Sequence, residues 1–316
     1  MKIPRLLFRI LSLSGGGNRL SVLIFHRVLP ERDPLFPDEM DKQRFDEICG
    51  WLKDWFDVLP LDRAVAQLKA GALPKGTACI TFDDGYADNH HVAMPVLLGH
   101  GLTATFFIAT GFLDGGRMWN DTIIEAVRAY SLPQLDLTSL GFDCYPVHTT
   151  DEKRSAISQL VNQIKYRPPA ERVEITEQLA VLAKVRLPND LMMTSQEVRE
   201  MHQAGMQIGA HTVSHPILAR LTKDQMHTEI SESKRFLENL LGERITLFAY
   251  PNGKAGEDYT AESVDIVRDF GFEAAVSTEW GTTTKADDLL QIRRFTPWDK
   301  SSLGFGLRMG ANMRIR

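Results

Sequence analysis

Two adjacent carboxylates and two closely spaced histidines are the residues of this chain whose types and spacing best fit catalysis. Asp83 and Asp84 directly follow an apolar run, and His211 and His215 lie four positions apart. Histidines at this spacing can meet one metal ion on a helical turn or a tight loop. One carboxylate and two neutral imidazoles leave coordination positions open, as in catalytic zinc sites. A metal held in that way activates water and polarises a carbonyl group.

The two carboxylates allow two roles at one place. Adjacent residues at a strand end point in opposite directions, so one carboxylate can bind metal while the other faces the substrate. The segment around His211 lacks the glutamate that a metalloprotease helix places beside its first histidine, so Asp83 is the expected general base. Taken alone, the Asp83-Asp84-Gly85 motif also fits an ordinary turn, and the two histidines also fit an exposed surface.

Seven apolar runs rich in β-branched or aromatic residues predict strands that are covered on both faces, as in a parallel sheet. They span residues 20–28, 77–85, 103–113, 206–215, 245–253, 273–281 and 290–298. Parallel α/β folds place their ligands at the carboxyl ends of such strands. The candidate site residues near those ends are His26, Asp83, Asp84, His211, His215, Tyr250, Pro251, Trp280, Arg293, Arg294 and Trp298.

Helical patterns alternate with these runs. Helices are expected over 41–56, 194–205, 222–242 and 260–271, and the last three begin at a threonine and end at a glycine. This alternation predicts an α/β fold, and the length of 316 residues suits one (β/α) barrel with additions. Residues 114–190 carry helical stretches separated by prolines and are interpreted as a helical insertion, with a separate second domain as the alternative.

Composition narrows the class of protein. Hydrophobic residues make up 43% and charged residues 24%, which is typical of a globular protein, and the net charge of -5 gives no reason to expect nucleic acid as a partner. No apolar stretch is long enough to span a bilayer. Residues 1–19 are interpreted as an amphipathic N-terminal leader rather than a secretory signal, which predicts a cytoplasmic protein with its domain at 20–316.

Three motifs together carry a resemblance to a known family. They are Thr81-Phe82-Asp83-Asp84-Gly85-Tyr86, His211-Thr212-Val213-Ser214-His215-Pro216, and the segment 244–253 with Phe248-Ala249-Tyr250-Pro251-Asn252-Gly253. In this order they resemble the polysaccharide deacetylases that contain the NodB homology domain, carbohydrate esterase family four. The resemblance covers about 20–300. It implies a distorted (β/α) barrel of about seven parallel strands, and removal of acetyl groups from sugars with one divalent metal, often zinc.

Carried over by position, the resemblance assigns a role to each motif. It makes Asp83 the catalytic base and Asp84, His211 and His215 the metal ligands. It places Tyr250 and Pro251 in the motif where a backbone N–H helps to hold the tetrahedral oxyanion. Preorganised donors of this kind contribute roughly 3 kcal/mol to catalysis.

Two departures from the family pattern change the expected roles. No histidine follows His227, so the usual late histidine that acts as general acid is missing. We assign that role to His26, because Ile24-Phe25-His26 resembles the early-histidine element of the biofilm-polysaccharide deacetylase branch; the alternative is a hydrogen-bonded core histidine. Ala249 stands where the family has an arginine beside the base, and we expect Arg293 or Arg294 to hold Asp83 instead.

Aromatic residues near the rim are the candidates for sugar contacts. Trp280 and Trp298 follow predicted strands and could stack on sugar rings, although single tryptophans more often serve packing. Asp88 and Asn89 are expected to cap the next helix, and the other histidines, His90 and His91 among them, are interpreted as surface or structural residues.

These observations favour a metal-dependent hydrolase that removes acetyl groups, most simply N-acetyl groups, from a polysaccharide, oligosaccharide or glycolipid precursor. A substrate of bacterial exopolysaccharide biosynthesis would agree with a cytoplasmic enzyme. The alternatives are a catalytically impaired carbohydrate-binding relative and a hydrolase of a non-sugar C–N bond. A further alternative is a non-haem iron oxygenase, because two histidines and a carboxylate also bind iron.

Overall fold

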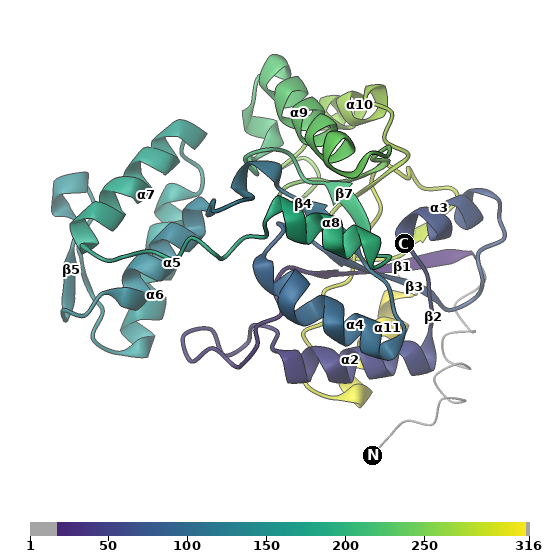
Figure 1. Cartoon of the computed structure of the whole chain (residues 1–316), viewed down its shortest axis with the longest axis horizontal. Helices are drawn as coiled ribbons and strands as arrows, with labels where there is room; N and C mark the ends of the chain where they lie inside the picture. Colours follow the sequence, from purple (N-terminus) through teal and green to yellow (C-terminus); the bar gives the residue numbers. More distant parts are fainter. Residues whose placement is uncertain (1–17, 314–316) are drawn as a thin grey trace.

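Seven parallel strands form one curved sheet at the centre of the molecule (Figure 1). The computed structural model describes residues 18–313, so the predicted leader at 1–19 lies outside the described residues except for its last two. The parallel strands are β1 (Arg19–Phe25), β2 (Asp57–Val58), β3 (Thr77–Phe82), β4 (Thr105–Ile108), β7 (Gln207–Ala210), β8 (Leu247–Ala249) and β9 (Ala274–Val276). The prediction of a distorted (β/α) barrel of about seven parallel strands is confirmed.

The order of the strands brings the predicted motifs to one edge of the sheet. The sheet runs β10-β1-β3-β4-β7-β8-β9, with β2 on the start of β3 and the short β10 (Thr283–Thr284) antiparallel to β1. β1, β3, β7 and β8 therefore all end on the same rim, because parallel strands share their direction. Strands β1 and β3 are buried along almost their whole length, which explains why they lack polar alternation.

The prediction of a strand at 290–298 was wrong in detail. This segment forms only isolated bridges, Leu23 with Phe295 and Val276 with Ile292. Two of its backbone N–H groups do not pair with a neighbouring strand. Arg293 N–H donates to the Thr283 hydroxyl, and Arg294 N–H donates to the Glu279 carbonyl. The segment thus lies between β9 and β1 and closes the barrel irregularly.

Four predicted helices are confirmed within about two residues at each end. They are α2 (Lys42–Trp55), α8 (Ser195–Gln203), α9 (Lys223–Leu241) and α10 (Ala261–Asp269). Thr194 with Glu197 and Thr222 with Gln225 form capping boxes, which satisfy backbone donors at the helix starts. Gly242 follows α9 with φ 73°, a left-handed conformation that glycine adopts without a steric penalty.

Several further elements were not predicted; all surround the sheet except the turn at Thr138–Leu140, which belongs to the insertion. The helices are α3 (Leu61–Lys69), α4 (Met94–His100) and α11 (Ser302–Asn312), and the short turns are η1 (Asn89–Ala93), η2 (Thr110–Phe112), η3 (Thr138–Leu140) and η4 (Leu218–Arg220). η1 is a π-helical turn, a rare geometry that is often found at functional sites. It continues directly into α4. Among residues 18–313, no helix has the length and apolar character needed to cross a membrane.

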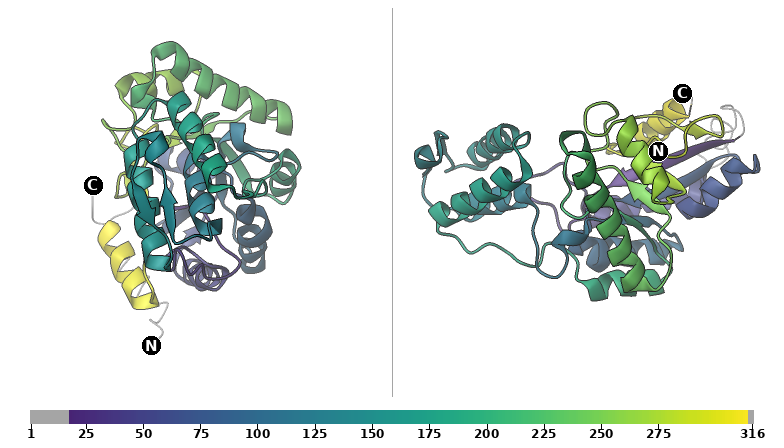
Figure 2. Two further views of the ribbon diagram at one scale, coloured as in Figure 1. Left: turned by 90° about the vertical axis from the view of Figure 1, so that its left-hand side faces the viewer. Right: turned by 90° about the horizontal axis from the view of Figure 1, so that it is seen from above.

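The inserted segment stands to one side of the barrel (Figure 2). It contains α5 (Trp119–Ala129), α6 (Thr150–Ile164), α7 (Pro169–Ala183) and a small antiparallel hairpin of β5 (Gln134–Asp136) and β6 (Cys144–Pro146). The hairpin was not predicted. These elements have their own apolar cluster, which Leu35 from the loop after β1 joins. The loop 26–41 therefore connects the barrel with the insertion.

Candidate active site

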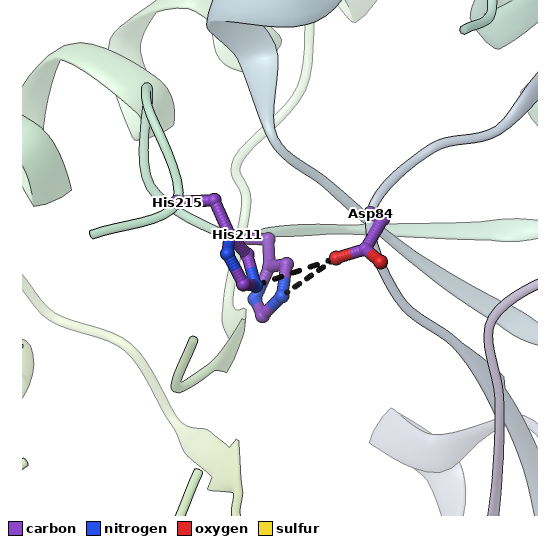
Figure 3. A group of neighbouring side chains, drawn as sticks. All are labelled: Asp84, His211 and His215. Carbon is purple, nitrogen blue, oxygen red and sulfur yellow. Dashed lines mark ion pairs between the residues drawn. The ribbon is translucent and has the colours of Figure 1, made fainter. Parts of the chain in front are cut away.

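Asp84, His211 and His215 converge at the carboxyl ends of β3 and β7 (Figure 3). Nε2 of each histidine lies 3.4 Å from Oδ1 of Asp84. The His211 Nδ1–H donates to the Ala249 carbonyl at 2.8 Å, which leaves its Nε2 with a free lone pair toward Asp84. The sequence prediction that these three side chains meet agrees with this geometry.

The arrangement fits a divalent metal ion. Ligand atoms about 2.0–2.1 Å from a tetrahedral zinc ion lie about 3.3–3.4 Å from one another. Oδ1 of Asp84 is buried and accepts no hydrogen bond from the described part of the chain, although both imidazoles face it. Burial lowers the pKa of His215 to about 4, so its imidazole is neutral and able to bind a metal near pH 7. A buried carboxylate without a donor requires a cation, and this donor set provides the place for one.

The backbone around the ligands adopts conformations that most residues avoid. Asp84, Thr212 and His215 have φ values of 79°, 65° and 51°, and such values in non-glycine residues often mark functional sites. The His215 N–H donates to the Thr212 hydroxyl at 3.1 Å. Glu229 of α9 accepts from the Val213 N–H at 2.9 Å and so supports the same loop. Sequence analysis missed Glu229, because its contact depends on how α9 packs.

Asp83 lies beside this triad and is held by Arg294. The two guanidinium nitrogens Nη1 and Nη2 donate to the two carboxylate oxygens of Asp83, each at 2.7 Å. The Arg294 Nε–H donates to the Ser277 carbonyl at 2.7 Å. Burial acts to raise the pKa of Asp83, but the charge of Arg294 outweighs it and holds that pKa below its ordinary value. Asp83 is therefore a charged carboxylate within a buried site.

The Arg293 side chain does not contact Asp83. It lies at the surface near Asp287, at 3.7 Å, and makes a 3.4 Å hydrogen bond to the Thr282 carbonyl. Of the two arginines named by the sequence, only Arg294 contacts Asp83. The arginine partner that Ala249 of β8 cannot supply to Asp83 is thus supplied by Arg294, from the segment that closes the barrel.

His26 stands exposed at the end of β1, which excludes the alternative of a core histidine. Its backbone carbonyl accepts from the Asn89 side chain at 2.8 Å. Asp88 accepts from the Arg27 Nε–H at 2.8 Å and from the Val28 N–H at 3.0 Å. The prediction that Asp88 and Asn89 cap a helix was wrong, because both side chains instead hold the turn that follows β1.

A cavity of about 480 Å³ opens beside the triad, between the barrel, the loop 26–41 and α5. His26, Asp84, Tyr86, Asp121 and Trp298 are among its lining residues. The Tyr86 hydroxyl donates to Asp121 Oδ1 at 3.3 Å, while Asp121 Oδ2 is buried without a partner in the described part of the chain. Burial raises the pKa of Asp121 to about 7. Sequence analysis missed Asp121, because it lies in the insertion and has no recognised motif around it.

Of the remaining candidates, Trp280 and Trp298 are exposed, whereas Tyr250 and Pro251 are buried. Trp298 is 65% exposed and lines the cavity, whereas Trp280 stacks on Phe295 with ring centres 6.1 Å apart and is not among the lining residues. Tyr250 is fully buried and stacks on Tyr259 at 3.9 Å. Its N–H donates to the Val276 carbonyl at 3.2 Å, and Pro251 is buried beside it. Ring packing thus occupies the Tyr250 side chain, and the assignment of Tyr250 and Pro251 to the motif that holds the oxyanion stays a prediction.

Comparison with known proteins agrees with this geometry. The sequence pattern of the family described as polysaccharide deacetylase matches residues 70–275, which include the Asp83-Asp84 motif and the two histidines that follow β7. The chain belongs to the polysaccharide deacetylase family. The family resemblance seen in the sequence motifs is thereby confirmed.

Relatives of this deacetylase-family chain are distant in sequence. YxkH of Bacillus subtilis (strain 168), provisionally named a polysaccharide deacetylase, is 23% identical over 278 residues, which are 87% of this chain and 70% of YxkH. The structure of Streptococcus pyogenes deacetylase PplD in complex with acetate is similar with a TM-score of 0.62 at 20% identity, covering 93% of this chain and 98% of PplD. The structure of IcaB from Ammonifex degensii is similar with a TM-score of 0.60 at 18% identity, covering 94% of this chain and 98% of IcaB. These two structures establish the fold that the family shares with this chain.

Proposed function

We propose that this chain is a metal-dependent hydrolase that removes acetyl groups, most simply N-acetyl groups, from an acetylated amino-sugar polymer, oligosaccharide or glycolipid precursor. One observation carries the proposal: a buried, paired carboxylate, Asp83, lies next to the Asp84–His211–His215 triad, whose Asp84 lines an open cavity. The family membership agrees with this reaction.

The residues around the triad supply the proton transfers. When bound, a divalent cation supplies Lewis acidity for the acetyl carbonyl and the attacking water. Asp83 accepts a proton from that water, and Arg294 keeps Asp83 ionised until the transfer occurs. Bond formation between the water oxygen and the carbonyl carbon is followed by cleavage of the C–N bond. His26 donates a proton to the departing nitrogen, so the products are acetate and a free amine.

The cavity is the place for the sugar. Its wall carries a large exposed aromatic ring, Trp298, together with hydrogen-bonding groups such as Asp121. Aromatic faces and precisely oriented polar groups are the usual means by which pockets hold polar rings. An extended rim between the barrel and α5 would suit an oligomer better than a single small amide.

Zinc is the ion that we propose for the triad. Two neutral imidazoles and one carboxylate suit zinc, and Asp84 with both histidines offers ligand atoms within 4.8 Å of one another. Iron would also accept this donor set, which is the basis of the oxygenase alternative. The clamped Asp83 favours hydrolysis, since a facial triad for oxygen chemistry needs no adjacent general base.

An acetate-release assay tests the proposal. Purified protein is incubated with acetylated amino-sugar oligomers and polymers, with and without chelator, and after addition of zinc. We expect acetate release that chelator abolishes and zinc restores, and none from the matched Asp83→Asn variant. Binding of oligomers without release by the zinc-loaded protein would instead show a carbohydrate-binding relative. Iron-dependent oxygen consumption with a 2-oxo acid would show an oxygenase.

A further inference from the structure

A second group of metal-ligating side chains lies outside the cavity, where η1 packs on α8. It consists of His90 and His91 in η1 and Glu197 and Glu200 in α8. The Nδ1 atoms of the two histidines are 3.3 Å apart. His90 Nε2 lies 3.0 Å from a Glu200 oxygen, and His91 Nε2 lies 2.7 Å from a Glu197 oxygen. Each imidazole thus has a carboxylate beside Nε2 and the other imidazole beside Nδ1, and the His90 Nδ1 also lies 3.9 Å from a Glu197 oxygen.

These contacts favour one tautomer of each imidazole. A carboxylate beside Nε2 favours the tautomer that carries its proton on Nε2, because that N–H then donates to the carboxylate. With both imidazoles in that form, the two Nδ1 atoms are acceptors with lone pairs, and they lie 3.3 Å from each other. Two facing acceptors repel unless a positive species lies between them. The pair therefore needs either a shared proton or a cation.

The spacing fits a cation. Two nitrogen ligands at about 2.0–2.1 Å from a tetrahedral zinc ion lie about 3.3–3.4 Å apart, as the two Nδ1 atoms do. Metal-bound histidines usually donate their other N–H to a carboxylate, which is the position that Glu197 and Glu200 occupy. The His90 side chain is 15% exposed and that of His91 is 59% exposed, so the group is reachable from solvent.

We propose that His90 and His91 form a second divalent-metal site of the imidazole type, in which Glu197 and Glu200 orient the two ligands and water completes the coordination. Zinc is the expected class of ion. The sequence interpreted both histidines as surface or structural residues, and the proposal gives them a specific role.

Occupancy of this site would act on the turn that carries His26. Asn89, the first residue of η1, donates to the His26 carbonyl, and the preceding Asp88 holds Arg27 and Val28 N–H. A metal that fixes His90 and His91 against α8 therefore fixes the residues that position the end of β1. The site is structural in this proposal and does not touch the substrate.

Metal stoichiometry tests the site independently of deacetylation. We begin from His211→Ala, which removes a ligand of the catalytic triad, and titrate zinc into the metal-free protein by calorimetry and mass spectrometry. One equivalent is expected to bind to this background. Adding His90→Ala and His91→Ala should abolish that equivalent, and Glu197→Gln should weaken binding by about 10–100-fold.

His202→Ala is the matched control, because His202 also belongs to α8 and pairs with Glu243 at 2.7 Å. It should leave zinc binding unchanged. Should folding of the double variant fail, His91→Gln alone provides the same comparison, since this side chain is mostly exposed. Zinc binding that survives loss of both histidines, or no binding at all in the His211→Ala background, would overturn the second site. Neither result would bear on acetate release by the unaltered chain.

Discussion

Arg294 and Asp83 form a two-point ion pair inside the protein, with both oxygen–nitrogen distances at 2.7 Å. The two residues are 1% and 2% exposed. The pair connects the end of β3 to the irregular segment that closes the barrel, and the remaining Arg294 contacts with Ser277 and Thr81 fix the guanidinium plane. Arg294 is thus the residue that orients the proposed base and keeps it charged.

Replacing Arg294 by methionine should damage both stability and the pH profile. Removing one partner of a buried pair leaves the other charge uncompensated, which destabilises a protein by about 3–5 kcal/mol. The pKa of Asp83 should rise, because Arg294 is what holds it down against burial. Protonation would then inactivate the base at higher pH, so the acid limb of kcat/KM against pH should move upward. Denaturant unfolding and the pH–rate profile measure the two effects.

Arg294→Lys is the control that separates charge from geometry. Lysine keeps the positive charge but cannot donate to both oxygens of Asp83 in one plane. We expect the acid limb of Arg294→Lys to shift less from that of the unaltered protein than the acid limb of Arg294→Met. Its kcat/KM should still be lower than that of the unaltered protein. Identical pH profiles for all three proteins would show that Arg294 does not control Asp83.

The sequence specified the parts of the site that come from strand ends. Asp83, Asp84, His211 and His215 follow strongly apolar runs, and the common direction of parallel strands was sufficient to bring them to one rim. The helix boundaries at Thr194 and Thr222 were predictable too, because capping is a local interaction between residues three apart.

What the sequence did not specify depends on contacts between distant segments. The segment 290–298 has the apolar pattern of a strand, but the donors of Arg293 and Arg294 bond outside the ladder. Asp88 resembles a helix cap, although its partners are Arg27 and Val28, about 60 positions away. No local sequence pattern predicts contacts between segments so far apart. Asp121 was not predicted as a site residue for the same reason, because only the packing of the insertion against the barrel brings it to the cavity.

Asp83→Asn and His211→Ala should separate proton transfer from metal binding. Asparagine is close in shape to aspartate and leaves all three metal-ligand candidates in place, so Asp83→Asn should keep its metal and lose turnover. His211→Ala removes a buried ligand and should lose the triad metal and activity together. Elemental analysis beside the acetate assay distinguishes the two results. Full activity of Asp83→Asn would remove Asp83 as the base.

Asp121 should make stability fall as the pH rises. Burial raises its folded-state pKa from 3.8 to about 7, so the folded protein binds this proton more tightly than the unfolded chain does. The resulting stabilisation is fully present below about pH 4 and is lost as the pH rises through 7. Asp121→Asn cannot ionise, so it should gain stability relative to the unaltered protein with rising pH, by up to about 4 kcal/mol at pH 8. Thermal unfolding from pH 5 to pH 8 checks this, with the exposed Asp190→Asn as control. A stability difference that is constant across this range would contradict the assignment.

His26→Ala should affect turnover rather than folding. The side chain is exposed, and the described part of the chain offers it no hydrogen-bond partner, so its removal should leave the melting temperature within the error of the measurement. As the proposed acid, His26 protonates the departing amine, and its loss should lower kcat by about 10²–10⁴-fold with little change in KM. His148→Ala, another exposed histidine, is the control. An unchanged kcat would mean that a different group donates the proton, and Asp121, which shares the cavity wall with His26, would be the next residue to test.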